Sequence, residues 1–358
     1  MSVKNWRSMN EQDLTKLARK LGALEPESWA HSQIQRGIEH LPRDLFVLLA
    51  VGDVIYPDNR HWLAETRSRN PYDPGGEFGP AIDRLLAAGA RVEDLTSIVA
   101  TMQMSLLVNL CVLLDDPGEL EPEVCDVRWR LFLVEESNAP DTPIDRLVEA
   151  LWEIVWTGAE SRPLQPIWTE SFQAKGTGAW RSMNEQELTE LFRQLGAQEP
   201  EGWARSQISE GIPQLLRYLF LRQAWRQIIA PDDRDWIIET HEDDPDQRDE
   251  FGEAIEAMLA AGAPAQDLTT VVRIMQWILL FRFCVLLDGG LAFRTGAGFS
   301  TLQELVGFCW RLSLVDDNDT PVAPIEGLHE SVLETDPTGR EMRPQEYFRN
   351  LDTRDPPG

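Results

Sequence analysis

Residues 94–115 read DLTSIVATMQMSLLVNLCVLLD, and residues 267–288 repeat the pattern as DLTTVVRIMQWILLFRFCVLLD. Both stretches open on Asp-Leu-Thr, which favours the start of a helix. Both then continue through mostly apolar residues without glycine or proline. A helix that is apolar on nearly all sides belongs in the interior of a fold. We therefore predict two central core helices, one in each half of the chain.

Length and apolar composition would also allow each stretch to cross a membrane. Polar residues interrupt the first stretch at Thr101, Gln103 and Asn109, and the second contains Arg273 and Arg282. Arginines inside a membrane are costly, and neither stretch has the flanking lysines and arginines typical of a cytoplasmic membrane boundary. We expect no membrane interaction.

The similarity between the two halves extends far beyond the core helices. Residues 6–66 align without a gap on residues 180–240, and 36 of these 61 positions are identical. The alignment continues through the core helices and, after an insertion in the second copy, from Trp129 and Trp310 onward. A repeat of roughly 160 residues is large enough to form a domain. We predict a tandem duplication with a first unit at 1–163, a linker at 164–179, a second unit at 180–344 and a polar tail at 345–358.

Each unit is predicted to be mainly α-helical with a minor β element. Several shorter helices precede the core helix, and the first of them has Asn10 or Asn184 as its N-cap. After the core helix, WRLFLV at 129–134 and WRLSLV at 310–315 alternate in polarity and lead into acidic turns, which is typical of strands. A last helix is expected after these strands. The glycine-rich segment 289–298 is interpreted as a flexible insertion of the second unit.

The overall charge restricts the kind of partner. The chain has 358 residues, with 33 lysines and arginines against 60 aspartates and glutamates, so its net charge is −27. Such a surface repels nucleic-acid phosphates and attracts basic molecules. The four cysteines have no zinc-ligand spacing, and the first residues lack the apolar segment of a signal peptide. We expect a reduced, cytoplasmic protein that does not bind nucleic acid.

No catalytic pattern is recognisable in the sequence. The five histidines are scattered, and none is shared between the repeats. The chain contains no HExxH metal motif, no GxSxG nucleophile elbow and no phosphate-binding glycine loop between a strand and a helix. We therefore expect no catalytic residues, no metal and no cofactor, and we favour a protein that is not an enzyme.

The first candidate binding surface is an acidic run in the second unit, whose counterpart in the first unit is nearly balanced in charge. Two interpretations remain open, a docking surface for a basic protein and a solvated loop. The spacing and the lack of the loop glycine argue against an EF-hand calcium site. The residues of this acidic run are Asp232, Asp233, Asp235, Glu239, Glu242, Asp243, Asp244 and Asp246.

Further candidates come from comparing the two copies. On the third helix of the second unit, Arg222, Trp225 and Arg226 form either an exposed partner-binding cluster or a half-buried helix face. The first unit is more apolar on its third and last helices, which favours packing of one unit on the other or a homodimer contact. Both copies also keep a Trp-Ala-x-Ser-Gln-Ile block, at 29–34 and 203–208, which is either structural or a binding groove.

These observations favour a non-enzymatic cytoplasmic binding protein, of the acidic inhibitor or immunity type, that engages a basic protein partner. One alternative is a structural or scaffolding homodimer. A second alternative is a small-molecule sensor or enzyme with a pocket near the Trp-Ala-x-Ser-Gln-Ile block.

Overall fold

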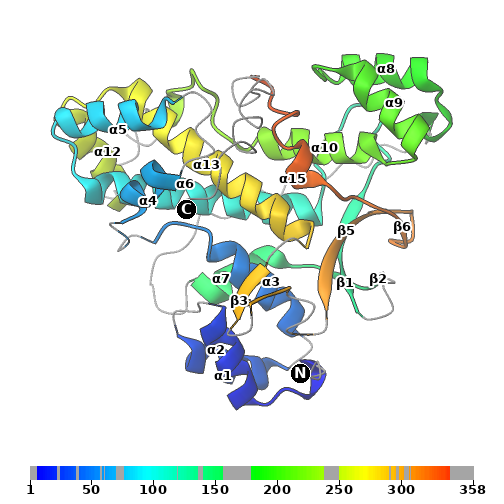
Figure 1. The fold of residues 1–358 in the computed structure, drawn as a ribbon, viewed down its shortest axis with the longest axis horizontal. Coiled ribbons are helices and arrows are strands. Elements are labelled where there is room, and N and C mark those ends of the chain that lie inside the picture. Colours follow the sequence, from blue (N-terminus) through cyan, green and yellow to red (C-terminus); the bar gives the residue numbers. More distant parts are fainter. Residues whose placement is uncertain are drawn as a thin grey trace, which may run out of the picture. The chain divides into compact units, whose positions relative to one another are not determined.

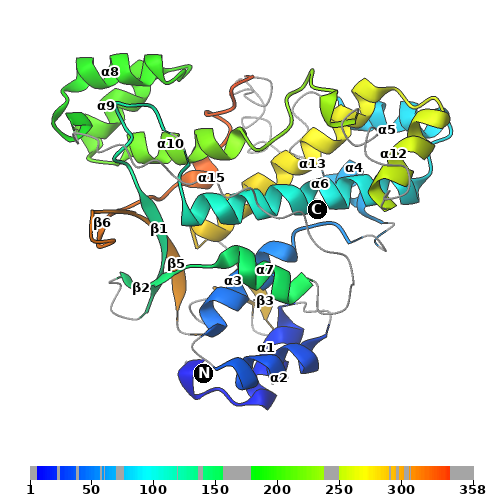
Figure 2. The same cartoon turned by 180° about the vertical axis from the view of Figure 1, so that it is seen from behind.

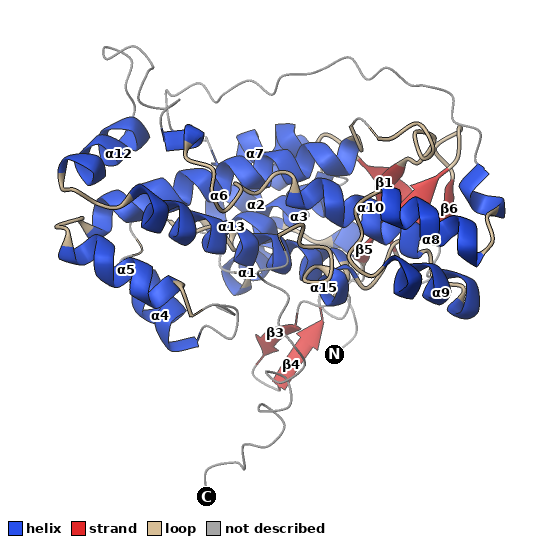
Figure 3. Ribbon diagram, turned by 90° about the horizontal axis from the view of Figure 1, so that it is seen from above, coloured by secondary structure: helices blue, strands red, loops and turns tan. Residues whose placement is uncertain are grey.

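The computed structural model of the chain describes residues 6–21, 25–37, 40–56, 59, 61–69, 76–118, 120–135, 140–155, 179–237, 250–289, 292–295, 298–301, 306 and 308–338. Within these residues the protein is mainly α-helical with a small amount of β structure, as Figure 3 shows. The predicted class of a mainly α-helical fold with a minor β element is therefore confirmed. We call residues 1–163 the first half and residues 180–344 the second half, and we call positions matched when the internal alignment pairs them.

Elements at matched positions follow the same order in both halves, and the second half adds the strands β3 and β4 after its core helix. Those of the first half are η1 (Trp6–Ser8), α1 (Glu11–Lys20), α2 (Pro26–Arg36), α3 (Leu41–Val51), α4 (Trp62–Arg69), α5 (Phe78–Ala87), α6 (Val92–Asp115), β1 (Trp129–Val134), β2 (Pro140–Ile144) and α7 (Leu147–Val155). Those of the second half are η3 (Ala179–Ser182), α8 (Glu185–Gln194), α9 (Pro200–Glu210), α10 (Gln214–Trp225), α12 (Glu250–Ala260), α13 (Ala265–Leu287), β3 (Ala292–Thr295), β4 (Gly298–Thr301), β5 (Cys309–Val315), β6 (Pro321–Pro324) and α15 (Leu328–Ser331).

The local sequence signals account for most element boundaries. The side chain of Asn10 accepts a hydrogen bond from the Asp13 backbone, and Asn184 forms a full capping box with Glu187. The predicted core helices are α6 and α13, each starting two residues earlier than the Asp-Leu-Thr signal indicates. The predicted strands are β1 and β5. The segment expected to be a flexible insertion instead contributes to the antiparallel pair β3 and β4.

A four-stranded antiparallel sheet combines strands from both halves in the order β2-β1-β5-β6 (Figure 1). At its centre, Leu131 of β1 lies opposite Leu312 of β5, and these two leucines occupy matched positions. The pairing is therefore symmetric about this leucine pair, as it would be in a dimer with a two-fold axis. The flanking pairs are Trp129 with Leu314 and Leu133 with Trp310.

Prolines lie on the two outer strands of this sheet. Pro140 and Pro143 are on β2, and Pro321 and Pro324 are at the matched positions of β6. Proline cannot donate a backbone hydrogen bond, so it is tolerated on edge strands and discourages further strands from pairing there. Productive pairing is thus directed to β1 and β5.

The chain forms two compact units, and each draws on both halves. Compact unit 1 comprises Met1–Val54, Met104–Gln227 and Leu279–Glu330, and compact unit 2 comprises Ile55–Gln103, Ile228–Ile278 and Ser331–Gly358. These units therefore do not coincide with the sequence repeats at 1–163 and 180–344. Residues 164–178 of the expected linker and the expected tail at 345–358 lie outside the described residues.

In compact unit 2, the two core helices exchange hydrogen bonds through a pair of matched glutamines. Gln103 donates through Nε2 to the carbonyl of Met275 at 2.9 Å, and Gln276 donates to the carbonyl of Met102 at 3.3 Å. Each Oε1 also accepts the backbone N–H of a matched isoleucine, Ile55 for Gln103 and Ile229 for Gln276. Both glutamines are buried; the two bonds of Gln103 are shielded from water, and the two bonds of Gln276 are partly shielded.

In compact unit 1, aromatic side chains of one half pack on those of the other. Phe46 of α3 lies edge-on to Trp310 of β5, with ring centroids 5.2 Å apart. The matched pair is Trp129 of β1 with Phe220 of α10, at 5.5 Å. The indole Nε1 of Trp310 also donates to the carbonyl of Pro42 at 3.1 Å. Each half thus completes the aromatic core of the other.

The additional apolar residues of the first half are on α3 and α7, two helices that pack on each other and run side by side in Figures 1 and 2. Leu49, Val51 and Leu151 are buried. These side chains therefore belong to the core of compact unit 1.

Both core helices are long and apolar enough to span a membrane by composition alone, with mean hydropathies of 1.9 for α6 and 1.8 for α13. Within an 18-residue apolar stretch of each helix, 56% of α6 and 78% of α13 is buried inside the structure. Burial of this extent is typical of core helices.

We predict that Gln103→Met lowers the free energy of unfolding by about 1–3 kcal/mol, because it leaves the Ile55 N–H buried without its acceptor. Gln276→Met is the matched variant and should cost a similar amount. Urea denaturation followed by circular dichroism measures both. Unchanged midpoints for both variants would show that the exchange does not stabilise the fold.

Candidate functional site

The predicted acidic run is described only in part. Asp232 and Asp235 are exposed and Asp233 is partly buried. The carboxylate of Asp233 accepts the backbone N–H of Asp235 at 2.8 Å, so Asp233 has a local capping role. The remaining predicted residues lie outside the described residues; they are Glu239, Glu242, Asp243, Asp244 and Asp246.

The predicted cluster on α10 is only partly accessible. Trp225 is 2% exposed, so its indole is a core side chain and not an exposed contact for a partner. Arg222 lies 2.6 Å and Arg226 3.5 Å from the same carboxylate oxygen of Glu121. The charge of the α10 arginine pair (Arg222 and Arg226) is therefore compensated from within the chain, which holds the pKa of Glu121 below its usual value against the opposing effect of burial.

The Trp-Ala-x-Ser-Gln-Ile blocks lie on α2 and α9. Trp29 and Trp203 are buried, whereas Ile34 and Ile208 are 44% and 50% exposed. The tryptophans thus have a packing role, and the isoleucines present an apolar side chain to solvent at matched positions.

Behind the first block is a buried ionic cluster that sequence patterns did not reveal. The Asp44 carboxylate is fully buried and accepts hydrogen bonds from Gln33 at 2.8 Å and Arg43 at 3.0 Å. Arg36 lies 2.8 Å from the same carboxylate. In the second half, position 218 is tyrosine and position 210 is glutamate. The cluster therefore belongs to the first half alone, where it ties α2 to α3.

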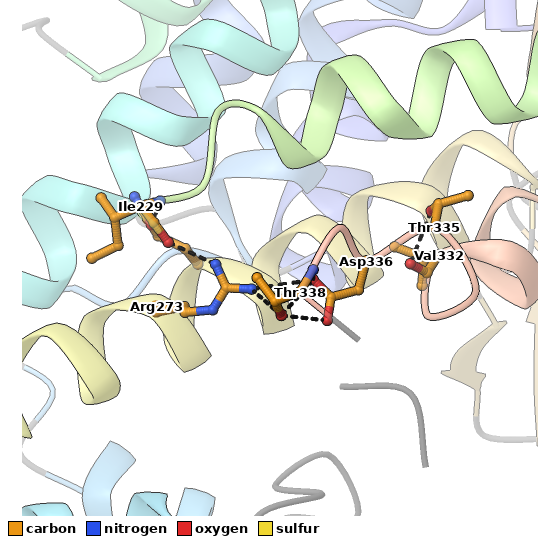
Figure 4. A network of polar contacts seen from close by, with 7 residues as sticks. Ile229, Arg273, Val332, Thr335, Asp336 and Thr338 are labelled. Carbon is orange, nitrogen blue, oxygen red and sulfur yellow. Dashed lines mark hydrogen bonds and ion pairs between the residues drawn. The ribbon is translucent and has the colours of Figure 1, made fainter. Parts of the chain in front are cut away.

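A second buried ion pair belongs to the second half alone (Figure 4). Arg273 of α13 is 5% exposed and lies 3.3 Å from the fully buried carboxylate of Asp336. Its guanidinium also donates to the Ile229 carbonyl at 2.6 Å, while Thr338 donates to Asp336 at 2.7 Å. The matched residues of the first half are Ala100 and Val155. Arg273 was visible as a charge inside an apolar stretch, but its partner, 63 residues away, was not.

The ends of the core helices carry a matched pair of aspartates with different surroundings. Asp288 accepts the backbone N–H of His329 at 2.8 Å, and the imidazole Nδ1 lies 2.5 Å from the same carboxylate oxygen. Asp115 has valine at the matched position, Val148. Burial raises the pKa of Asp115 to about 7, and the backbone hydrogen bond from Leu147 offsets this only in part.

None of these groups forms a metal site in the described part of the chain, where no three histidine, cysteine, aspartate or glutamate side chains are placed to hold an ion. Cys111 and Cys284 are buried, and burial raises the pKa of each thiol. A buried thiol with a raised pKa is a poor nucleophile.

We predict that Asp336→Ala lowers the free energy of unfolding by about 3–5 kcal/mol, because it leaves the Arg273 guanidinium buried without its carboxylate. The double variant Arg273→Ala and Asp336→Val installs the residues of the first half and should cost less. Denaturant unfolding compares the two. A double variant that is less stable than Asp336→Ala would contradict this account.

We predict that stability depends on pH through Asp115. A raised pKa means that the folded state takes up a proton near pH 7, whereas the unfolded state does so only near pH ~4. The free energy of unfolding should therefore fall as pH rises between these values and stay at its lower level above pH 7. Asp115→Asn should flatten this dependence and raise stability at pH 8 by about 1 kcal/mol or more, since one pKa unit corresponds to about 1.4 kcal/mol.

The matched control is Asp288→Asn, which weakens an existing contact with His329 and should lower stability without removing the pH dependence that comes from Asp115. Thermal unfolding across the pH range distinguishes the two variants. An Asp115→Asn protein that keeps the parental pH profile would rule out this aspartate as the titrating group.

No protein-family model, no curated protein and no solved structure matches this chain. A function for it therefore has to come from the charge, burial and hydrogen bonding of its own residues.

Proposed function

We propose that the protein is a non-enzymatic, cytoplasmic binding protein that engages a basic protein partner, as an inhibitor or immunity-type protein does. The observation that supports this most is the surplus of carboxylates. With 60 acidic and 33 basic residues, at least 60 − 33 = 27 carboxylates have no basic residue of their own within the chain. A surface of this kind accelerates association with a positively charged protein.

The described ion pairs add to this argument, because they use basic side chains internally. The α10 arginine pair is held by Glu121, Arg84 forms two hydrogen bonds with Asp267, and Arg273 is buried against Asp336. These four arginines are matched to three carboxylates, so the remaining residues still carry an excess of acidic groups. The exposed Asp232 and Asp235 begin the longest acidic run in the sequence, and we propose this run as the docking surface.

We also propose that the chain arose by tandem duplication, so that a binding surface can be present once in each half. The symmetric pairing of β1 with β5 and the glutamine exchange between α6 and α13 support this proposal. The acidic run belongs to the second half alone, which favours one partner per chain at that surface.

The test begins with a tagged pull-down from native lysate at low and high salt, which identifies a basic partner. Association rates are then measured for Asp232→Asn combined with Asp235→Asn, and for a further variant that neutralises Asp243, Asp244 and Asp246. The control variant, Glu123→Gln combined with Glu210→Gln, removes two exposed charges elsewhere.

We expect the acidic-run variants to associate several-fold more slowly at low salt and to show a weaker salt dependence, because long-range attraction is reduced. The control variant should stay close to the parent protein. Equal association rates for all variants would contradict the proposed docking surface, and the absence of any basic partner at low salt would contradict the function itself.

A further inference from the structure

The contacts between the two halves occur in reciprocal pairs. In the sheet, Leu131 lies opposite its matched residue Leu312. In the aromatic core of compact unit 1, Phe46 packs on Trp310 while Trp129 packs on Phe220. In compact unit 2, Gln103 and Gln276 donate to one another's helices.

Reciprocal contacts of this kind define an isologous interface, in which the same patch serves on both sides. The surface through which the two halves contact each other is also buried in the core of the protein. Trp129, Phe220, Phe46 and Trp310 are each at most 3% exposed. A half that lost its counterpart would expose this aromatic core to water, at a cost set by the apolar area.

We infer that the surface joining the two halves is a duplicated dimer interface, which accepts the corresponding half of a second copy of this chain in place of the half to which it is covalently linked. This inference rests on the proposed tandem duplication but not on the proposed basic partner. The partner of β1 has to be a strand with the sequence of β5, because the existing pairing is between these two strands. A second copy of this chain supplies such a strand. The prolines of β2 and β6 discourage the alternative pairing at the sheet edges.

Several ion pairs cross between the halves, and two of these contacts find no counterpart in a pair of like halves, which makes unlike pairing preferable to like pairing. Arg282 of α13 lies 2.8 Å from Asp53, just beyond α3. In a pair of first halves Asp53 would face Asn109, and in a pair of second halves Arg282 would face Gln227. The second such contact is Arg222 with Glu121, and position 48, which matches Arg222, is leucine. Each like pair therefore loses charge partners that the unlike pair keeps.

The test uses the full chain with a protease recognition sequence placed in the expected linker at 164–179 and cut after folding. Unlabelled and nitrogen-15-labelled cut proteins are mixed, unfolded in urea, refolded together and weighed by native mass spectrometry. The uncut chain, refolded under the same conditions, is the control for refolding.

We expect the cut halves to remain associated before unfolding and to return as pairs of one first half with one second half, in which labelled and unlabelled halves are mixed statistically. Like pairs should be a minority. The combined substitutions Asp53→Gln and Arg282→Asn, which make the two sides equivalent at this contact, should increase the fraction of like pairs.

Leu131→Asp should abolish pairing of the cut halves, because it places a charge at the centre of the sheet. Val322→Asp on β6, where the valine is 59% exposed, is the matched control and should leave pairing intact. Halves that refold as separate monomers would overturn the inference. Halves that fail to refold while the uncut chain recovers would overturn it as well, since the interface would then be insufficient to bring separate chains together.

Discussion

The exchange of hydrogen bonds between Gln103 and Gln276 is the constraint on which the rest of the structure depends. Each glutamine lies in the middle of a mostly apolar helix, and a buried amide without partners costs several kcal/mol. In the structure both side chains are satisfied because α6 lies against α13 with matched carbonyls, Met102 and Met275, in reach. An isolated half would leave its glutamine without the carbonyl acceptor that the other half supplies, so the polar atoms of the core help to specify the pairing of the halves.

The two halves differ chiefly in buried charge. The first half has the Asp44 cluster and the second has the ion pair of Arg273 with Asp336. Buried charges are tolerated only when their partners are present, and so each group has its partners in the same half. Such groups make the halves chemically distinct at sites where they share a fold. Together with the one-directional contact between Arg282 and Asp53, they favour a first half paired with a second half.

The sequence allowed the local elements to be predicted because their signals are local. The N-caps at Asn10 and Asn184, the apolar stretches of α6 and α13 and the alternating strands β1 and β5 all appear where short-range patterns place them. The composition of the compact units could not be predicted in the same way. The partner of Leu131 lies 181 positions away, and alternation within a strand indicates only that it pairs, not with which strand.

At the candidate site, too, local features could be predicted from the sequence and long-range contacts could not. Charge composition pointed to an acidic exterior, and Asp232 and Asp235 are indeed exposed. Trp225 was considered as part of an exposed cluster, but it is a core residue, because the amphipathic pattern of α10 is weak and burial there is decided by neighbouring elements. The partner of Arg273 could not be predicted either. Arg273 and Asp336 are both in the second half, and the first half has Ala100 and Val155 at the matched positions.

The pairing of the halves can be measured most directly through the native cysteine of β5. Cys309 lies opposite Val134 of β1, and directly opposed residues in an antiparallel pair have the Cα separation that a disulfide requires. Oxidation of the Val134→Cys protein, followed by protease digestion and peptide mass mapping, should identify a bond between positions 134 and 309. The variant Leu133→Cys, whose side chain points to the other face of the sheet, should not form it. A Val134→Cys protein whose new thiol stays free, or pairs with Cys125 instead, would show that β1 and β5 do not meet in this register.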